Sequence, residues 1–303
     1  MALPAIAPYA MPGAAELPTN KVSWTPDPKR AALLIHDMQN YFVGAFTPGQ
    51  SPVPELLENI QRLRQHCSSL GMPVVYSAQP GGQTPEQRGL QLDLWGPGIK
   101  GGPHDKQIVE ALAPREGDIF LTKWRYSAFI KTGLLELLRE HGRDQLIICG
   151  IYAHIGCLQT ASHSFMHDVQ AFLVADAVAD FSLEQHRLAL NYAAKLCAVT
   201  VTTRQVIEHL GTRTDDGARS LSRQQVREDV AELLAQAAAG LGEDENLLER
   251  GLDSIRLMSL VERWRRTGAE ISFVDLAERP TLNEWYALLA SNVPPPASAA
   301  ARS

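Results

Sequence analysis

The feature that most constrains the fold is a regular alternation of short apolar runs with longer amphipathic stretches between Ala31 and about Leu210. Short runs rich in β-branched residues are typical of strands buried in a parallel sheet, and the stretches between them are typical of crossover helices. One such helix is expected over Pro54–Gly71, where apolar residues recur at helical spacing. We expect strands at Ala32–Ile35, Pro73–Ser77, Asp118–Thr122, Gln145–Ile151, Ala171–Ala175 and Ala198–Thr202. The alternation predicts an α/β domain, a three-layer sandwich around a parallel sheet.

The pattern changes after His209, where the decapeptide GTRTDDGARS has no apolar period and is typical of a linker. Beyond it only helical patterns occur, over Gln224–Ala238 and Ser254–Arg266, so a small all-α bundle is expected. The final residues, PPPASAAARS, are of low complexity and are expected to be disordered. The predicted organisation is an α/β domain over residues 1–210, a linker at 211–220, a helical domain at 221–293 and a tail at 294–303.

Composition excludes several classes of protein. A chain of 303 residues with 45% hydrophobic content can form two domains. Its net charge of −6 gives no cationic surface for nucleic acid. The N-terminal segment 1–20 has four prolines and no long apolar run, so we expect an arm, and neither an export signal nor a membrane span.

Cysteine and histidine spacing bears on location and metal binding. The four cysteines show no CxxC spacing, which favours reduced thiols and a cytoplasmic protein. Only His163 and His167 have a spacing that puts two histidines on one helix face. No third ligand is evident near them, so we expect hydrolytic chemistry without a metal.

Polar side chains cluster just after the predicted strands, where ligands bind in open parallel sheets. The first strand ends in Asp37, the third leads to Lys123, and the fourth leads to the pair Gly156-Cys157. An acid, a cation and a thiol at three strand ends form a candidate constellation for hydrolysis. Taken singly, each has an ordinary alternative: the aspartate as a helix cap, the lysine as a solvated cation and the cysteine as a packed core residue.

Six segments strengthen the catalytic interpretation: LLIHDMQNYF, SAQPGGQ, LWGPGI, LTKWRYSAF, GIYAHIGCLQTA and DAVADFS. Over roughly residues 20–208 the chain resembles the isochorismatases of the cysteine-hydrolase superfamily. Amidases of that superfamily use an Asp, Lys, Cys triad, and the resemblance aligns Asp37 and Lys123 with the first two positions. In the amidases a glycine is followed six residues later by the catalytic cysteine. When that glycine is aligned with Gly150, the cysteine position falls on Gly156, and Cys157 comes one residue too late. One residue at a helix start turns a side chain by about 100°, so we expect no thiol nucleophile.

The isochorismatase resemblance implies a reaction that needs no covalent intermediate. Isochorismate is an enol ether; protonation of its methylene carbon gives an oxocarbenium ion, which water captures before collapse to pyruvate and 2,3-dihydro-2,3-dihydroxybenzoate. One well-placed general acid suffices, and we expect it to be Asp37. Its pKa, ordinarily ~3.9, would have to rise through burial or the substrate's two carboxylates, against the effect of Lys123. Lys123 is expected to hold a substrate carboxylate or to orient Asp37.

Six further residues are expected around the substrate: Gln79, Arg88, Tyr152, Phe42, Trp95 and Tyr126. The first three are candidates for binding the carboxylates and ring hydroxyls, and the guanidinium of Arg88 suits a carboxylate in particular. The last three could form an apolar wall around the methylene group. Each could instead be an ordinary core or loop residue.

The string LLERGLDSIRLMSLVERW resembles the phosphopantetheine attachment site of carrier proteins, with Ser254 as the modified residue. A hydroxyl at a helix N-terminus is accessible to a transferase, and the helix start favours the resulting phosphodiester. Asp253 is expected to orient the arm or the transferase's metal. The ordinary alternative is that Asp253-Ser254 simply caps a helix, but the acidic, all-helical setting after a linker favours the carrier interpretation.

Together the two resemblances imply the bifunctional isochorismatase and aryl carrier proteins of catechol siderophore assembly. Such a protein would carry 2,3-dihydroxybenzoate on a phosphopantetheine at Ser254. Its expected partners are a 2,3-dihydroxybenzoate-AMP ligase, a phosphopantetheinyl transferase and a nonribosomal peptide synthetase condensation domain, docking on Ser254–Arg266 near Met258. Self-association through the α/β domain is also implied by the resemblance.

Three alternatives remain at this point. The first is a nicotinamidase-like thiol amidohydrolase that uses Cys157 and is fused to a carrier domain. The second is a non-catalytic scaffold whose α/β domain merely supports the carrier. The third keeps the enzyme but changes the substrate to an amino analogue of isochorismate.

Overall fold

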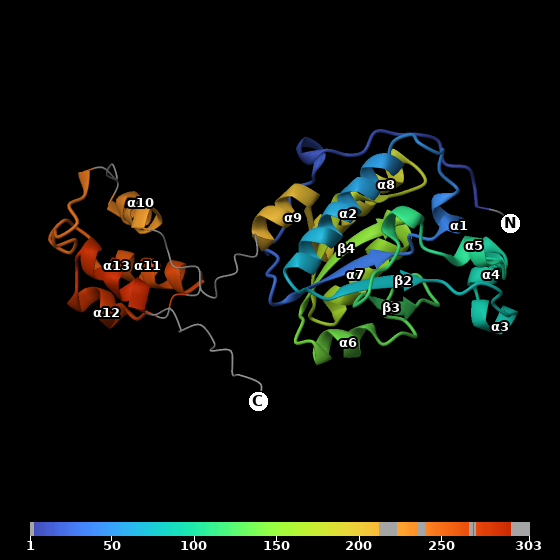
Figure 1. Ribbon diagram of the computed structural model, residues 1–303. Helices are drawn as coiled ribbons and strands as arrows, with labels where there is room; N and C mark the ends of the chain where they lie inside the picture. The colour runs from blue at the N-terminus through green and yellow to red at the C-terminus, as the bar shows by residue number, and fades with distance from the viewer. Residues whose placement is uncertain (1–2, 212–222, 235–239, 267–268, 270, 292–303) are drawn as a thin grey trace, which may run out of the picture. The chain divides into compact units, whose positions relative to one another are not determined.

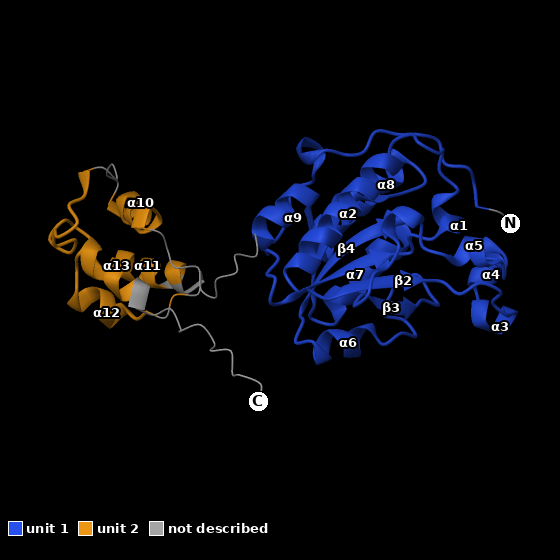
Figure 2. Cartoon of the chain, viewed as in Figure 1, with its two compact units in different colours: residues 1–212 blue, residues 213–303 orange. Residues whose placement is uncertain are grey.

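The structure, a computed structural model, describes residues 3–211, 223–234, 240–266, 269 and 271–291. The chain divides into two compact units, residues 1–212 and 213–303 (Figure 2). The predicted linker beyond Gly211, the predicted tail 294–303 and the predicted end of the helix Gln224–Ala238 lie outside the described residues.

The first unit is built on a six-stranded sheet with the order β3-β2-β1-β4-β5-β6, in which all neighbours are parallel (Figure 1). Its strands are β1 (Ala31–His36), β2 (Val74–Ala78), β3 (Ile119–Thr122), β4 (Gln145–Ile151), β5 (Gln170–Ala179) and β6 (Ala198–Val201). The predicted parallel α/β fold is therefore confirmed. Strand β1 pairs with β2 on one side and β4 on the other, so the strand order reverses between β1 and β4, the point where such folds bind ligands.

Strand β5 is longer than the predicted Ala171–Ala175. The prediction ended too early because a polar residue, Asp176, stands inside the strand. An isolated aspartate at that place favours a strand end in the sequence. In the structure its carboxylate accepts hydrogen bonds from the backbone N–H (2.7 Å) and hydroxyl (2.8 Å) of Thr203, at the start of a helix. The strand continues to Ala179, because the aspartate has a partner beside the sheet.

Helices cover both faces of this sheet (Figure 1). Helix α2 (Val53–Ser69), predicted as Pro54–Gly71, packs on one face with α9 (Thr203–Leu210). The opposite face carries α6 (Leu134–Glu140), α7 (Leu158–Met166) and α8 (Leu183–Leu196). The remaining elements are short: α1 (Asn40–Val43), α3 (Pro85–Arg88), α4 (Gln91–Trp95), α5 (Pro103–Lys106), η1 (Ala14–Glu16), η2 (Glu110–Leu112) and the π-helical turn η3 (Ala153–Cys157).

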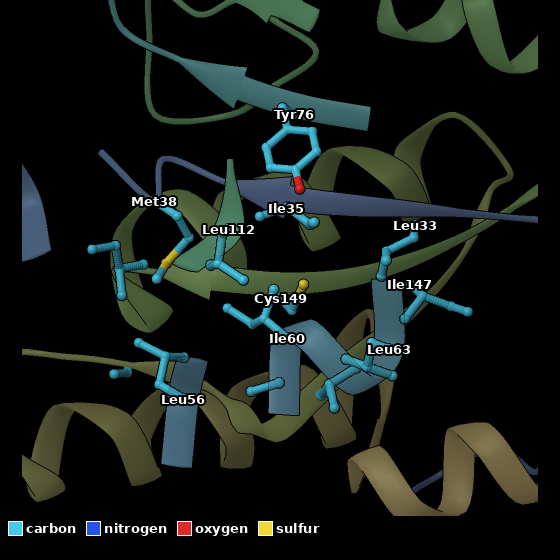
Figure 3. Packing of buried hydrophobic residues seen from close by; sticks show 14 of the residues in the cluster. Leu33, Ile35, Met38, Leu56, Ile60, Leu63, Tyr76, Leu112, Ile147 and Cys149 are labelled. Carbon is cyan, nitrogen blue, oxygen red and sulfur yellow. The ribbon is translucent and has the colours of Figure 1, made fainter. Parts of the chain in front are cut away.

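The core explains why the strands read as continuous apolar runs. Alternate residues of β1 point to opposite faces, so that Leu33 and Ile35 join one buried cluster and Leu34 joins the other. Leu56 and Ile60 of α2 fill the first cluster (Figure 3). With helices on both faces, a parallel sheet has no solvent-facing side that would call for polar residues.

The described residues of the second unit form helices joined by loops and include no strand. The helices are α10 (Arg223–Leu234), α11 (Ser254–Arg266), α12 (Phe273–Glu278) and α13 (Leu282–Ser291). Trp264 and Trp285 lie at the centre of the unit, both 0% exposed, with ring centroids 5.7 Å apart. The indole N–H of Trp264 donates to the carboxylate of Asp229 at 2.8 Å, so the buried polar atom is satisfied. This confirms the predicted helical bundle.

Candidate active sites

The first unit contains a partly open cavity beside the ends of β1 and β4. All nine residues predicted for the first site line it, although they come from segments spread between residues 37 and 156. The parallel sheet explains this, because its strands all end at one edge. Leu3 of the N-terminal arm also lines the cavity, a contact that no local pattern in the sequence indicates.

Asp37 stands at the centre of the polar side of this cavity. It follows β1 with a φ of 50°, a left-handed conformation that is uncommon for a non-glycine residue and typical of functional positions. Its Oδ1 accepts a hydrogen bond from Ser77 Oγ at 2.8 Å, and its Oδ2 accepts from Gln79 Nε2 at 3.3 Å. Lys123 Nζ forms an ion pair with Oδ2 at 2.9 Å. Ser77 was not predicted, yet it lies on β2 two residues before Gln79, on the same strand edge.

Lys123 is 1% exposed, and Asp37 is 4% exposed. The ammonium also donates to the carbonyls of Arg125 at 2.7 Å and Tyr126 at 3.3 Å, so its three N–H groups all have acceptors in the protein. This arrangement suits the orienting role predicted for Lys123 better than direct binding of a substrate carboxylate.

The charge pattern lowers the pKa of Asp37. Burial acts to raise it, but the Lys123 charge, His36 and the hydrogen bonds from Lys123 and Ser77 together outweigh burial. In the unliganded protein the carboxyl is therefore ionised at neutral pH. The upward shift that a general acid requires has to come from the substrate.

A second cation lies close by. Arg88 is 5% exposed, and its guanidinium donates to Gly96 O at 3.0 Å and to Gln79 Oε1 at 3.1 Å. Among the described residues it has no carboxylate partner. Because Gln79 also donates to Asp37, its amide links the guanidinium to the acid.

Aromatic rings form the opposite wall. Tyr152 stacks on Phe181 with centroids 4.2 Å apart, and Trp95 stacks on the same ring at 6.0 Å. The Trp95 indole N–H donates to the hydroxyl of Tyr126 at 2.6 Å, and the Tyr152 hydroxyl donates to Phe42 O at 2.8 Å. The Tyr152 hydroxyl is thus engaged within the protein. Phe181 was not predicted, although it belongs to the quoted segment DAVADFS.

Gly156 and Cys157 lie on different sides of the backbone. Gly156 lines the cavity, whereas Cys157 is 0% exposed and belongs to the apolar cluster beneath α7 and α8. Burial raises the pKa of the Cys157 thiol well above its usual value, and the nearby carboxylates add to this. A protonated thiol packed in the core cannot attack a substrate in the cavity, so the geometry disfavours the amidase alternative.

The second predicted site lies at the start of α11. Asp253 caps this helix, because its Oδ1 accepts the backbone N–H of Arg256 at 2.9 Å. Ser254, the next residue, is exposed, and within the described residues its hydroxyl makes no hydrogen bond. Since Asp253 does the capping, the serine hydroxyl is left accessible.

Two further features of the described residues bear on other classes of function. They hold no group of three or more His, Cys, Asp or Glu side chains that could ligate a metal ion. None of their helices combines the length and apolar character that a membrane span requires.

Comparison with known proteins shows the family to which each part of the chain belongs. Residues 31–205 match the isochorismatase domain family, and residues 224–289 match the phosphopantetheine attachment site family. The chain is 56% identical to "Isochorismatase" of Bacillus subtilis over 95% of this chain and 96% of that protein. It is 42% identical to "Enterobactin synthase component B" of Escherichia coli K12, over 97% of this chain and 100% of that protein.

Among solved structures, a cysteine hydrolase from Pseudomonas syringae pv. phaseolicola superimposes with a TM-score of 0.58 at 25% identity. The match covers 62% of this chain and 96% of the hydrolase chain. It agrees with an isochorismatase-like fold for the first unit. The chain therefore belongs to the isochorismatase family and joins that hydrolase domain to a phosphopantetheine-binding domain.

Proposed function

We propose that this protein hydrolyses isochorismate to pyruvate and 2,3-dihydro-2,3-dihydroxybenzoate and carries an activated aryl acid on its second domain. The observation that carries the hydrolase half is the pairing of a buried acid, Asp37, with a glycine at position 156 on the cavity wall. The cavity offers a proton donor and no nucleophilic side chain at that place. An enol ether is the kind of bond that such a site can break.

The steps balance with one acid. Asp37 gives its proton to the methylene carbon of CH2=C(COO−)–O–R, which becomes the methyl group of an oxocarbenium ion. Water adds to the cationic carbon, and its released proton returns to Asp37. The hemiketal then breaks its C–O bond to give pyruvate and the ring alcohol R–OH.

The protonation of Asp37 is coupled to substrate binding in this proposal. The free carboxyl has a lowered pKa, held down chiefly by Lys123 against burial. Two substrate carboxylates in the same cavity would repel the Asp37 charge and raise its pKa, because nearby like charges disfavour ionisation. Substrate binding is then accompanied by the uptake of a proton, and Asp37 becomes protonated only when the substrate is bound.

Arg88 is the proposed ligand of a substrate carboxylate. It is a buried cation without an acidic partner in the described part of the chain, and a guanidinium can bind a carboxylate with two parallel hydrogen bonds. Gln79, bonded to both Arg88 and Asp37, would align that carboxylate with the acid. Phe42, Trp95, Tyr126 and Tyr152 supply the wall that excludes water from the methylene group.

The carrier half of the proposal rests on Ser254. The phosphopantetheine-binding domain implies a phosphopantetheine group, and we assign its attachment to the exposed Ser254 hydroxyl beside the capping residue Asp253. Ile255 and Met258, on the same helix, are 80% and 52% exposed. Such apolar side chains beside the arm suit docking of a transferase, an aryl-AMP ligase and a condensation domain in siderophore assembly. These partners imply a cytoplasmic protein.

The test uses the full chain and two readouts. Purified protein is mixed with isochorismate, and pyruvate is followed with lactate dehydrogenase. The same preparation is treated with coenzyme A and a phosphopantetheinyl transferase, and its intact mass is measured. We expect pyruvate release and a mass increase of one phosphopantetheine; failure of either readout removes the corresponding half of the proposal. Parallel assays with nicotinamide and with the 2-amino analogue of isochorismate test the remaining substrates.

A further inference from the structure

His36, the last residue of β1, has no task in the reaction described above. Its side chain lines the cavity and is 0% exposed. Nδ1 lies 2.9 Å from Ile151 O, and Nε2 lies 3.3 Å from Tyr126 O. Burial of an imidazole is costly unless its polar atoms have partners. The ring is hydrogen-bonded to the last residue of β4 and lies against the segment after β3, which carries Lys123.

The hydrogen bond to Ile151 defines which nitrogen carries the proton. A carbonyl oxygen can only accept, so the shorter of the two contacts, at 2.9 Å, assigns the proton of a neutral ring to Nδ1. Burial lowers the pKa of His36, and the Lys123 charge adds to this, whereas Asp37 opposes it. The ring is therefore neutral at neutral pH, and its one N–H group holds the Ile151 carbonyl.

The imidazole occupies the space where a side chain of residue 156 would stand. A Cβ atom built on Gly156 would lie 2.1 Å from Cε1, 2.8 Å from Nε2 and 3.0 Å from Nδ1 of His36. All three distances are far below van der Waals contact. All three nearest atoms belong to the His36 ring, so the ring is the closest obstacle to a side chain at this position.

A second glycine restricts His36 from the backbone side. Gly150 pairs with His36 in the sheet, and a Cβ there would lie 2.2 Å from the His36 carbonyl oxygen. Gly150 also has a φ of 112°, which L side chains rarely adopt. The backbone of Gly150 thus lies directly against the backbone of His36, and the backbone of Gly156 lies directly against its ring. These two close contacts fix the position of His36.

We propose that His36 is a positioning residue for the general acid and that residue 156 must be glycine because the imidazole fills its side-chain space. The inference rests on the proposed isochorismate hydrolysis. His36 Nδ1 lies 3.8 Å from Asp37 Oδ1, and Tyr126 O lies 3.3 Å from both His36 Nε2 and Lys123 Nζ. Displacement of the ring therefore disturbs the acid and the Tyr126 carbonyl, one of the two that hold Lys123.

The test is a size-compensation cycle. Gly156→Ala adds the clashing Cβ. His36→Asn keeps an N–H group where Nδ1 stands but removes the ring atoms Cε1 and Nε2, which lie nearest to that Cβ. The double variant combines the two changes. Gly133→Ala is the matched control, because a Cβ added at Gly133 would meet no atom within 4 Å and the residue has no left-handed φ. His36→Leu keeps bulk but lacks the N–H group.

We expect Gly156→Ala to lower kcat by about 100-fold, the effect of misplacing a catalytic group by roughly an ångström. His36→Asn and Gly133→Ala should stay within about fivefold of the parent protein, and the double variant should equal His36→Asn. His36→Leu should lose about tenfold in kcat with little change in KM, because the carbonyl partner is lost and not the substrate contacts. Independent, multiplying effects of the two changes in the double variant would overturn the proposal, as would full activity of Gly156→Ala.

Thermal melting covers the case in which Gly156→Ala does not fold. Recovery of the melting transition in the double variant then supports size compensation, and an equally unfolded double variant contradicts it. The parent protein separates this inference from the proposed function. If the parent releases no pyruvate, the hydrolase proposal fails; if it does and the cycle shows no compensation, only the role of His36 fails.

Discussion

The two domains hold the groups that we propose to react in opposite ways. Asp37 is 4% exposed and contacts Ser77, Gln79 and Lys123, whereas Ser254 is exposed at the start of a helix and its hydroxyl has no hydrogen-bond partner among the described residues. A group that protonates carbon needs a fixed position in a cavity, because a small displacement costs rate. A group that bears a swinging arm must be reachable by several enzymes. The accessibility of each residue thus follows from the chemistry proposed for it.

The largest effect that can sharpen this comparison is a complete loss. Ser254→Ala removes the only oxygen that we propose to be modified, so intact mass after treatment with coenzyme A and a transferase should show no addition. Ser259→Ala, an exposed serine on the same helix, is the control and should be loaded fully. Isochorismate cleavage should be unchanged in both variants. Addition to Ser254→Ala would disprove the assignment.

Asp37→Asn tests the buried group. An amide keeps the size of the carboxyl but cannot give up a proton, so kcat should fall by about 10³-fold, within the range for loss of a general acid. Asp93→Asn, an exposed acid on α4 near the cavity, should leave kcat unchanged. Loading of Ser254 should continue in both. A folded Asp37→Asn protein with normal pyruvate release would favour another acid, whereas a parent protein without turnover would favour the scaffold alternative.

The sequence predicted the sheet well because buried parallel strands are continuous apolar runs, and β4 has the predicted bounds Gln145–Ile151. It also predicted which residues line the cavity, since the strand-end segments carry them. It could not predict that all three N–H groups of Lys123 have acceptors, because two of these are backbone carbonyls and a main-chain oxygen leaves no mark on residue type.

The sequence also offers no indication of the close packing between His36 and Gly156. In the sequence His36 is only the neighbour of the proposed general acid Asp37, and Gly156 stands where amidases have their nucleophile. Only their three-dimensional proximity, with 2.1 Å between a built Cβ and the ring, relates the two positions. Helix spacing does not explain the exposure of Ser254, because Leu257 and Val261, three and seven residues further on, are buried on the same side of the helix. The serine is exposed because it is the first residue of α11.

The pH dependence of the hydrolase domain offers a finer test. The free Asp37 carboxyl has a lowered pKa and is ionised at neutral pH, whereas the reaction needs it protonated. Above that pKa, each unit of pH reduces the protonated fraction tenfold, so kcat/KM should fall about tenfold per unit between about pH 5 and 8. The value of kcat should vary less, because bound carboxylates raise the pKa of the acid. A kcat/KM that rises with pH would contradict proton uptake on binding. Phosphopantetheine loading of Ser254 does not involve the Asp37 carboxyl and therefore serves as the internal control.

The smallest effect is expected at Cys157, the residue that an amidase reaction would need most. Its thiol is fully buried in the apolar cluster on the far side of the backbone from the cavity, and burial keeps it protonated. Cys157→Ala should therefore change kcat by less than about twofold and lower stability by about 1 kcal/mol, the cost of a small cavity. Pyruvate assays and thermal melting would measure both. A loss of about 100-fold in kcat in a folded variant would mean that the Cys157 sulfur takes part in the reaction. The comparison between the two domains would then have to be made between Cys157 and Ser254, and no longer between Asp37 and Ser254.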